Sequence, residues 1–265
     1  MKNIIKKWYE RLGFPKKYDE EFYAALSSLK ADIPENPKDF RDDEHTAPEA
    51  LLAYLYYCEP LSEKYAALGI PEDVLLDTLS DLVVWTNTHY TLHGEVGLSQ
   101  TGWLINHVTF SIFKLGRLQF GFTPAECDIH EINVKKGDPI LAVHIPEGAP
   151  MTPEACKDSL ERAPEFFARY FPDYNWKCFT CHSWLLDKTL LGFISADSNI
   201  AKFRELFTIV KSDVEDAAIR YVFRWDATRE SLPTLEAKST LAKKMKEYVL
   251  GGGVLYASLG YINRA

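Results

Sequence analysis

The residues of this chain that are best placed to do chemistry lie in one loop, from Ile145 to Thr152. The loop follows an apolar segment, 139–145, that is typical of a strand, and it ends where Thr152 and Pro153 mark the start of a helix. A strand end, a glycine at Gly148 and a helix N-terminus together expose peptide N–H groups, and the helix dipole favours an anion beside them. The pattern predicts a site for a phosphate-bearing cofactor.

An ordinary strand-to-helix turn is the alternative interpretation of the same loop. The prolines at positions 146, 150 and 153 have no N–H to donate, and Glu147 and Glu154 place negative charge nearby. On spacing alone, both interpretations stay open.

Polar residues on the flanking strands are candidates for catalysis and substrate binding. His144, near the end of the second strand, could act as a general base near neutral pH, and Glu147 could do so if it were desolvated. Arg117 and Gln119 alternate with apolar neighbours on the first strand and could bind a carboxylate or a phosphate. The structural alternatives are a satisfied strand histidine, an exposed loop carboxylate, and a solvated strand face or ion pair.

One motif matches a known cofactor pattern without the setting that the cofactor needs. Cys178-Phe179-Thr180-Cys181-His182 has the spacing of c-type haem attachment, but no export signal is present. On a strand, the two cysteines point to opposite faces, which disfavours haem and zinc alike and favours buried core cysteines. Ser183 follows His182 directly, so the two side chains cannot form an activated pair, and no nucleotide-binding glycine motif occurs.

The composition bounds the class of protein. The chain has 265 residues, 46% of them hydrophobic and 26% charged, which fits roughly two folded domains. A net charge of −8 argues against a nucleic-acid or anionic membrane partner. Neither a signal peptide nor an apolar run long enough to span a bilayer is seen. The five cysteines are an odd number, which argues against a framework of disulfides. We expect a reduced, cytoplasmic protein.

Elements that could position these residues follow from periodicity and turn signals. The first hundred residues are predicted to be helical, and strands begin at Gly116, where apolar and polar residues alternate. Predicted helices cover 19–30, 47–68 with a break at Pro60, 71–92, 101–115, 152–167, 198–207, 214–225 and 234–248. Predicted strands cover 116–122, 126–134, 139–145, 176–186 and 208–211, and 254–262 is an apolar tail.

Several of these segments together resemble a known family. The resemblance rests on the order and spacing of Gly116-Arg117-Leu118-Gln119-Phe120, Val143-His144-Ile145-Pro146-Glu147-Gly148, Ser159-Leu160 with Phe166-Phe167, Cys181-His182-Ser183-Trp184-Leu185-Leu186 and Ser198-Asn199-Ile200. The chain is similar to a two-domain acyltransferase-like family with a helical N-terminal domain and a C-terminal domain like that of the GNAT N-acetyltransferases. The resemblance implies an α+β fold, with a helical domain over 1–114 and a GNAT-like mixed sheet flanked by helices over 115–265.

The resemblance also implies a reaction and a site. In the wider superfamily a loop with the pattern Arg/Gln-x-x-Gly-x-Gly/Ala binds the diphosphate of acyl-CoA; it corresponds here to 145–150, where only Gly148 fits. The residues implied to hold acetyl-CoA or a longer acyl-CoA are Ile145, Gly148, Ala149, Met151 and Thr152, with Arg117 and Gln119 on the substrate. His144 or Glu147 would deprotonate an amine, and Ser183 would protonate the leaving thiolate. Neither a metal nor haem is implied.

Two functions from different classes follow. The first is an N-acyltransferase that acts on the amine of a small molecule or peptide. The alternative is a non-catalytic small-molecule or peptide-binding protein on the same fold, which the degenerate loop favours. Retained chemistry is favoured if Arg117, Gln119 and His144 converge. The acceptor, the acyl length and the oligomeric state are not encoded in any motif of the chain.

Overall fold

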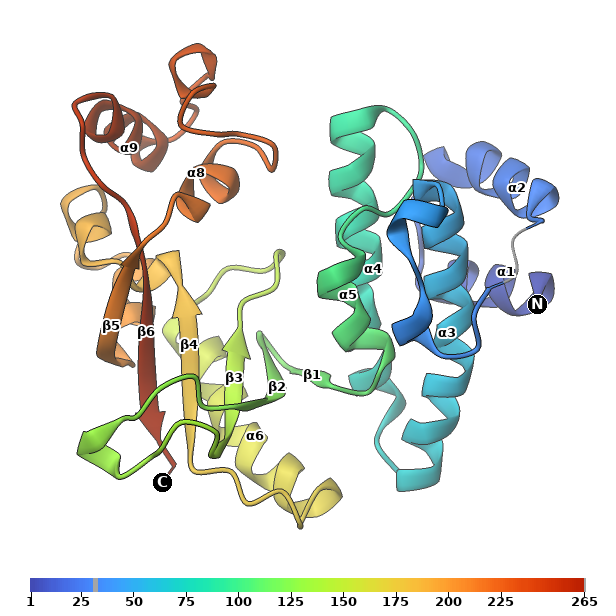
Figure 1. Ribbon diagram of the computed structural model, residues 1–265, viewed down its shortest axis with the longest axis horizontal. Helices are drawn as coiled ribbons and strands as arrows, with labels where there is room; N and C mark the ends of the chain where they lie inside the picture. Colours follow the sequence, from blue (N-terminus) through green and yellow to red (C-terminus); the bar gives the residue numbers. More distant parts are fainter. Residues whose placement is uncertain (31–32, 265) are drawn as a thin grey trace. The chain divides into compact units, whose positions relative to one another are not determined.

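The computed structural model describes residues 1–30 and 33–264, and the chain divides into two compact units, Met1–Leu115 and Gly116–Ala265. Each unit has its own secondary structure (Figure 1). No helix among the described residues is both long enough and apolar enough to cross a membrane.

The first unit is built from helices, as predicted. Its elements are α1 (Lys2–Arg11), η1 (Lys16–Tyr18), α2 (Asp19–Ser28), η2 (Pro37–Asp39), η3 (Asp42–Glu44), α3 (Ala47–Leu68), α4 (Glu72–His93), α5 (Thr101–Val108) and the short strand β1 (Ile112–Leu115). Helix α3 starts with a capping box in which Thr46 and Glu49 bond each other's backbone N–H groups, and it ends at Gly69 in the left-handed conformation. The predicted break at Pro60 is wrong, because α3 continues through it while burying residues before and after the proline.

The second unit is a sheet flanked by helices. Its elements are β2 (Leu118–Pro124), η4 (His130–Ile132), β3 (Pro139–His144), α6 (Pro153–Tyr170), β4 (Cys178–Ser183), η5 (Trp184–Leu186), η6 (Lys188–Gly192), α7 (Asn199–Glu205), β5 (Thr208–Val214), α8 (Ala217–Val222), η7 (Leu232–Thr234), α9 (Thr240–Leu250) and β6 (Tyr256–Asn263). Within this unit the strand order is β2-β3-β4-β6-β5, with β3 and β4 parallel and the pairs β2–β3, β4–β6 and β5–β6 antiparallel. The predicted α+β class is confirmed.

Helix α6 covers one face of this sheet (Figure 1). Phe122 of β2 packs edge-on against Phe167 in α6 and against Phe171 directly after the helix. Leu141 on β3, the register partner of Phe122, is fully buried. On the opposite face, Ile140 joins Ile129 and Val134 of the β2–β3 connection in a second apolar cluster. Side chains alternate between these two faces along each strand, so the face of every site residue is fixed by its position.

Several predicted elements differ from the observed ones: the strand predicted over 176–186 is β4 and the turn η5, and the helices predicted over 214–225 and 234–248 are the shorter or shifted α8 and α9. Three further differences concern 101–115, 126–134 and 254–262. The helix predicted over 101–115 ends at Val108, because Phe110 takes a positive φ of 63° and turns the chain into β1. The strand predicted over 126–134 is only an isolated bridge, Ile129 to Val134, around η4. The apolar tail 254–262 contains a central strand, β6, whose apolar run is buried between β4 and β5.

Candidate active site

Strands β3 and β4 pair over only part of their length. Their parallel pairing joins Leu141 to Phe179 and Ala142 to Thr180, and no pairing between them is found farther along in the described chain. Each strand nevertheless continues, β3 paired with β2 up to His144 and β4 paired with β6 up to Ser183. The carboxyl ends of two adjacent parallel strands therefore separate, and peptide groups on their facing edges are left for another partner.

Two of the predicted site residues lie side by side at this end of the sheet. Gln119 of β2 and His144 of β3 are direct register partners, so their side chains stand on the same face. That face is the one opposite α6. His182 of β4 stands on the same face across the separation, since its neighbour Thr180 is the register partner of Ala142. Gln119 is fully buried, His144 is half-buried and His182 is exposed.

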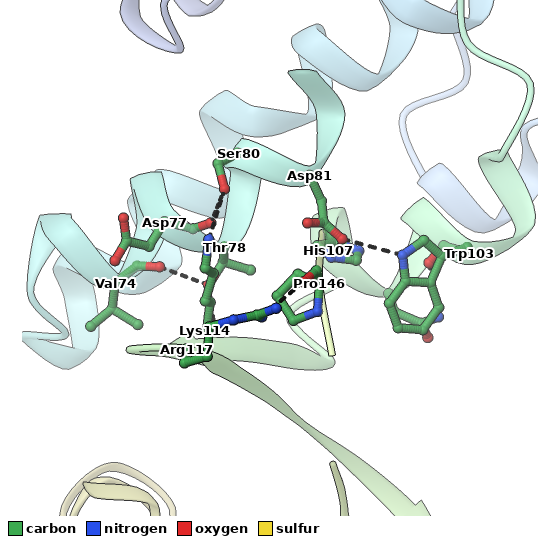
Figure 2. Close-up of polar contacts among 11 residues, drawn as sticks. Val74, Asp77, Thr78, Ser80, Asp81, Trp103, His107, Lys114, Arg117 and Pro146 are labelled. Carbon is green, nitrogen blue, oxygen red and sulfur yellow. Dashed lines mark hydrogen bonds and ion pairs between the residues drawn. The ribbon is translucent and has the colours of Figure 1, made fainter. Parts of the chain in front are cut away.

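Arg117 holds the loop that follows β3. Its Nη1 donates a hydrogen bond to the carbonyl oxygen of Pro146 at 2.8 Å (Figure 2). Its Nε is buried with no acceptor in the part of the chain that the structure describes. Burial lowers the pKa of Arg117 from its ordinary value, while the nearby Cys156 thiol opposes that shift. The β2–β3 register thus brings Gln119 and His144 together, whereas the contacts of Arg117 are with the loop after β3 and with Cys156 of α6.

A buried serine on α6 holds the backbone at the start of β2, at Arg117 and Leu118. The Ser159 hydroxyl accepts hydrogen bonds from the backbone N–H of Arg117 at 2.7 Å and of Leu118 at 3.2 Å, and it donates to the carbonyl of Ala155. Gly116 turns the chain there with a φ of +77°, and a Cβ on it would lie 3.0 Å from the Ser159 hydroxyl. The approach of β2 to α6 therefore requires glycine at this position.

The loop between β3 and α6 exposes its backbone. Residues 147–150 are exposed, and none of their N–H groups has an acceptor in the described chain. Gly148 has a φ of +129°, which L side chains rarely adopt, and its missing Cβ would meet open space. At the end of the loop Thr152 caps α6 by accepting from the N–H of Ala155, and Pro153 takes the first helical position. The N–H groups of Gly148 and Ala149 thus face solvent just before a helix N-terminus.

The remaining predicted site residues are exposed, lie at the ends of the loop or have a capping role. Glu147 is exposed, so nothing desolvates its carboxylate. Ile145 and Met151 are half-buried at the two ends of the loop. The Ser183 hydroxyl accepts from the N–H of Leu185 and caps η5, and by the alternation of β4 it stands on the face opposite to His144. Ser183 is therefore badly placed to share chemistry with His144.

The cysteine motif is part of the sheet core. Cys178 and Cys181 are buried on opposite faces of β4, and burial raises the pKa of Cys178 to about 11 and of Cys181 to about 12. Both thiols are protonated at neutral pH. No cluster of three or more histidine, cysteine, aspartate or glutamate side chains that could hold a metal is found among residues 1–30 and 33–264.

Sequence reasoning missed an aromatic group directly after β4. Trp184 of η5 stacks on Tyr221 of α8 with ring centroids 5.9 Å apart, and Tyr221 meets Trp225 edge-on at 5.4 Å. Tyr221 is 57% exposed. Trp184 follows the separating end of β4, so the group offers an exposed aromatic surface beside the candidate site. Only the fold brings 184 and 221 together; the single local signal was the tryptophan at the strand end.

The helical unit also contains a buried group of polar side chains that no sequence motif predicted. Asp81 of α4 lies 3.1 Å from Nε2 of His107 on α5 and accepts a hydrogen bond from Nε1 of Trp103 at 3.3 Å (Figure 2). His107 is fully buried and Asp81 is 3% exposed. A neighbouring hydroxyl, Thr78, accepts from the backbone N–H of Lys114 and ties β1 to α4. Hydrogen bonding satisfies the buried carboxylate and holds the two helices in register.

A mixed sheet whose parallel pair separates beside an N–H-rich loop and a helix start defines the architecture of a GNAT-like acyltransferase. The family models agree along the whole chain. An N-acyltransferase N-terminal domain matches residues 5–110, and a GNAT-like C-terminal domain matches residues 112–262. The chain belongs to this two-domain N-acyltransferase family, which confirms the predicted resemblance.

Solved structures share this fold across both units. An acyltransferase in complex with decanoyl-CoA is 27% identical, with a TM-score of 0.81 over 98% of this chain and 87% of that one. An acyltransferase in complex with decanoyl-CoA and teicoplanin is 23% identical, with a TM-score of 0.79 over 97% of this chain and 87% of that one. A third acyltransferase structure, with CoA and 10C-teicoplanin, has the same scores. No curated protein matches the chain.

Proposed function

We propose that this protein transfers an acyl group from acyl-CoA to an amine of a small molecule or peptide. The observation that carries the proposal is the separation of β3 and β4 beside the exposed loop 145–152, with His144 and Gln119 on one face of the separating strands. The solved acyltransferases of the same fold hold decanoyl-CoA or CoA, which supports acyl-CoA as the donor.

The donor fits the groups that the loop presents. The exposed N–H groups of Gly148 and Ala149 and the N-terminus of α6 suit a diphosphate, and the open space at Gly148 lets phosphate oxygens approach the backbone. The buried Nε of Arg117 is a further donor behind the loop. Pro146 and Pro150 supply no N–H, so fewer donors face the diphosphate than in the superfamily pattern.

The chemistry is direct transfer. Acyl-CoA supplies an activated thioester carbonyl. His144, half-buried at the end of β3, takes the proton of the attacking amine, and Gln119 beside it orients the imidazole or the acceptor. Peptide N–H groups on the facing edges of β3 and β4 stabilise the negative charge that develops on the carbonyl oxygen. The tetrahedral adduct then collapses: the carbon–sulfur bond breaks, and CoA leaves as a thiolate that takes up the proton from His144. Exposed Glu147 and the capping hydroxyl of Ser183 have no part in this scheme.

The aromatic surface of Trp184 and Tyr221 suits an apolar or aromatic portion of the acceptor. A solved acyltransferase of the same fold is in complex with decanoyl-CoA and teicoplanin, which supports a second ligand bound together with the donor. We therefore expect acceptors that carry both an amine and an apolar ring or chain, since stacking on an exposed tyrosine gains more than an aliphatic contact of equal size.

The decisive experiment measures CoA thiol release from acetyl-, octanoyl- and decanoyl-CoA against a panel of amines, using the wild type and His144→Gln. We expect amine-dependent release, with kcat about 100-fold lower in His144→Gln and the Kd for CoA unchanged. CoA binding without turnover on any amine would favour the non-catalytic binding protein. Absence of CoA binding at millimolar concentration would refute the proposal.

A further inference from the structure

The helical unit contains a second group of residues with the chemistry of a nucleophile and its base. The imidazole of His89 on α4 lies between a hydroxyl and a carboxylate: its Nδ1 is 3.1 Å from Oγ of Ser99, and its Nε2 is 3.6 Å from Oε1 of Glu95. A serine, a histidine and a carboxylate in this order can activate a hydroxyl, whatever the fold that carries them. All three come from one short stretch of chain, at the end of α4 and just after it.

The backbone holds this arrangement in place. Gly94 ends α4 with a φ of +72° and reverses the chain, so that 95–99 run back along the last turns of the helix. Gly97 lies so close that a Cβ would be 2.7 Å from the Cβ of Ala47 and 3.0 Å from Nε2 of His89. The N–H of Leu98 donates to the carbonyl of Ala47 at 2.9 Å, which fixes the residue next to Ser99. The glycine and this bond clamp the imidazole, which is 4% exposed.

Burial also keeps the imidazole in the form that a base needs. The pKa of His89 is lowered, mainly by burial and further by His93, whose ring centroid is 4.5 Å away, while Glu95 acts in the opposite direction. Nε2 of His89 has no hydrogen-bond partner among the described residues, since Oε1 of Glu95 is 3.6 Å away, so Glu95 acts on the ring through its charge. A neutral imidazole with its proton on Nε2 leaves Nδ1 free to accept the Ser99 proton. The carboxylate then stabilises the charge that the ring gains.

The nucleophile is accessible and lies beside a helix start. Ser99 is exposed, whereas His89 is buried behind it. Helix α5 begins two residues later at Thr101; the N–H of Trp103 donates to the carbonyl of Gln100 at 3.1 Å, and those of Thr101 and Gly102 have no acceptor in the described chain. Gly102 in that turn has open space where a Cβ would be, so a small acyl group can approach. Donors of this kind stabilise an oxyanion.

We propose that Ser99 is an activated nucleophile that accepts an acyl group from an activated ester or thioester. Oγ of Ser99 attacks the acyl carbonyl while its proton passes to Nδ1 of His89, and a bond forms between Oγ and the acyl carbon. The carbon–oxygen or carbon–sulfur bond to the leaving group then breaks, and His89 returns the proton to that group. Water activated by the same imidazole hydrolyses the acyl-serine to the free acid. This activity is independent of the proposed amine acylation.

The test uses 4-nitrophenyl acetate, which needs no CoA site. The full-length protein is incubated with the ester, nitrophenolate release is followed, and the acylated residue is located by mass spectrometry of the intact protein and its peptides. We expect a single acetyl group on Ser99 that is absent in Ser99→Ala. Glu95→Gln should slow acylation about two- to fivefold, because the carboxylate is more than half exposed. His89→Asn should abolish acylation.

Controls separate activation from loss of folding. Ser28→Ala removes another exposed serine, whose hydroxyl bonds only helix carbonyls, and it should leave acylation unchanged. Ser99 and Glu95 are exposed, so their variants keep the wild-type melting temperature even if His89→Asn does not fold. Samples are quenched in acid during turnover; no acetyl group on Ser99 in them, together with nitrophenolate release that is unchanged in Ser99→Ala, would overturn the proposal. Equal acylation rates in the wild type and a folded His89→Asn, or in Glu95→Gln if His89→Asn is unfolded, would also overturn it.

Discussion

Gly148→Ala tests whether the loop before α6 binds the donor. Gly148 has a φ of +129°, and alanine in this region costs about 1–2 kcal/mol. Residues 147–150 are exposed and make no hydrogen bond to the rest of the described chain. The free loop of the variant can therefore relax to a negative φ, and the cost returns only when a ligand requires the original backbone. We expect the Kd for CoA to rise about 5- to 30-fold while the melting temperature stays constant.

Gly137→Ala is the matched control. Gly137 also has a positive φ, +91°, and open space for a Cβ, but its N–H donates to the carbonyl of Ala125 at 2.8 Å. This turn cannot relax without losing the bond, so the strain remains in the folded state. We expect a melting temperature about 2–8 °C lower and an unchanged Kd for CoA.

The two variants should thus show opposite effects in isothermal titration with CoA and in thermal unfolding. A Kd within twofold of the wild type in Gly148→Ala would refute the assignment of this loop to the diphosphate. Equal weakening of CoA binding in both variants would show that the effect is general rather than local.

Three further predictions concern stability and reactivity. Ser159→Ala removes the acceptor of two backbone N–H groups at the start of β2, so it should lower the free energy of unfolding by about 1–3 kcal/mol in urea titrations; an unchanged midpoint would contradict the anchoring role. In the native protein at pH 8 a thiol reagent should modify half-buried Cys127 first, because burial raises the pKa of Cys178 and Cys181 and shields them; rapid reaction of all five thiols would contradict this. Because folding lowers the pKa of His89, the unfolded chain binds a proton more readily, and stability should fall as the pH drops below about 6.5; His89→Gln should lose that part of the pH dependence in melting curves, and an identical decline in both would refute it.

Local patterns predicted the elements that carry strong signals. Thr152 and Pro153 predicted the start of α6, and the apolar alternation of β2 and β3 predicted those strands close to their observed bounds. The same local reasoning failed where nonlocal contacts decide. The apolar run 254–262 was predicted only as an apolar C-terminal tail. It forms strand β6 because β4 and β5 offer hydrogen-bonding edges on both sides of it. Pro60 predicted a break, but α3 buries residues on both sides of it.

By itself, the sequence predicted the helical first half, the strands after Gly116 and the candidate donor loop, because these depend on periodicity, capping residues and spacing along the chain. The family and its α+β fold followed from the resemblance of five segments to a known family. Only the tertiary structure decided which side chains share a face. Gln119 and His144 are 25 positions apart and meet because of the β2–β3 register, and Ser183 is directed away from them by the alternation of β4. The group of Trp184 and Tyr221 and the pair of Asp81 and His107 likewise come from packing between elements. Register and packing depend on nonlocal contacts, which no single segment of the chain specifies.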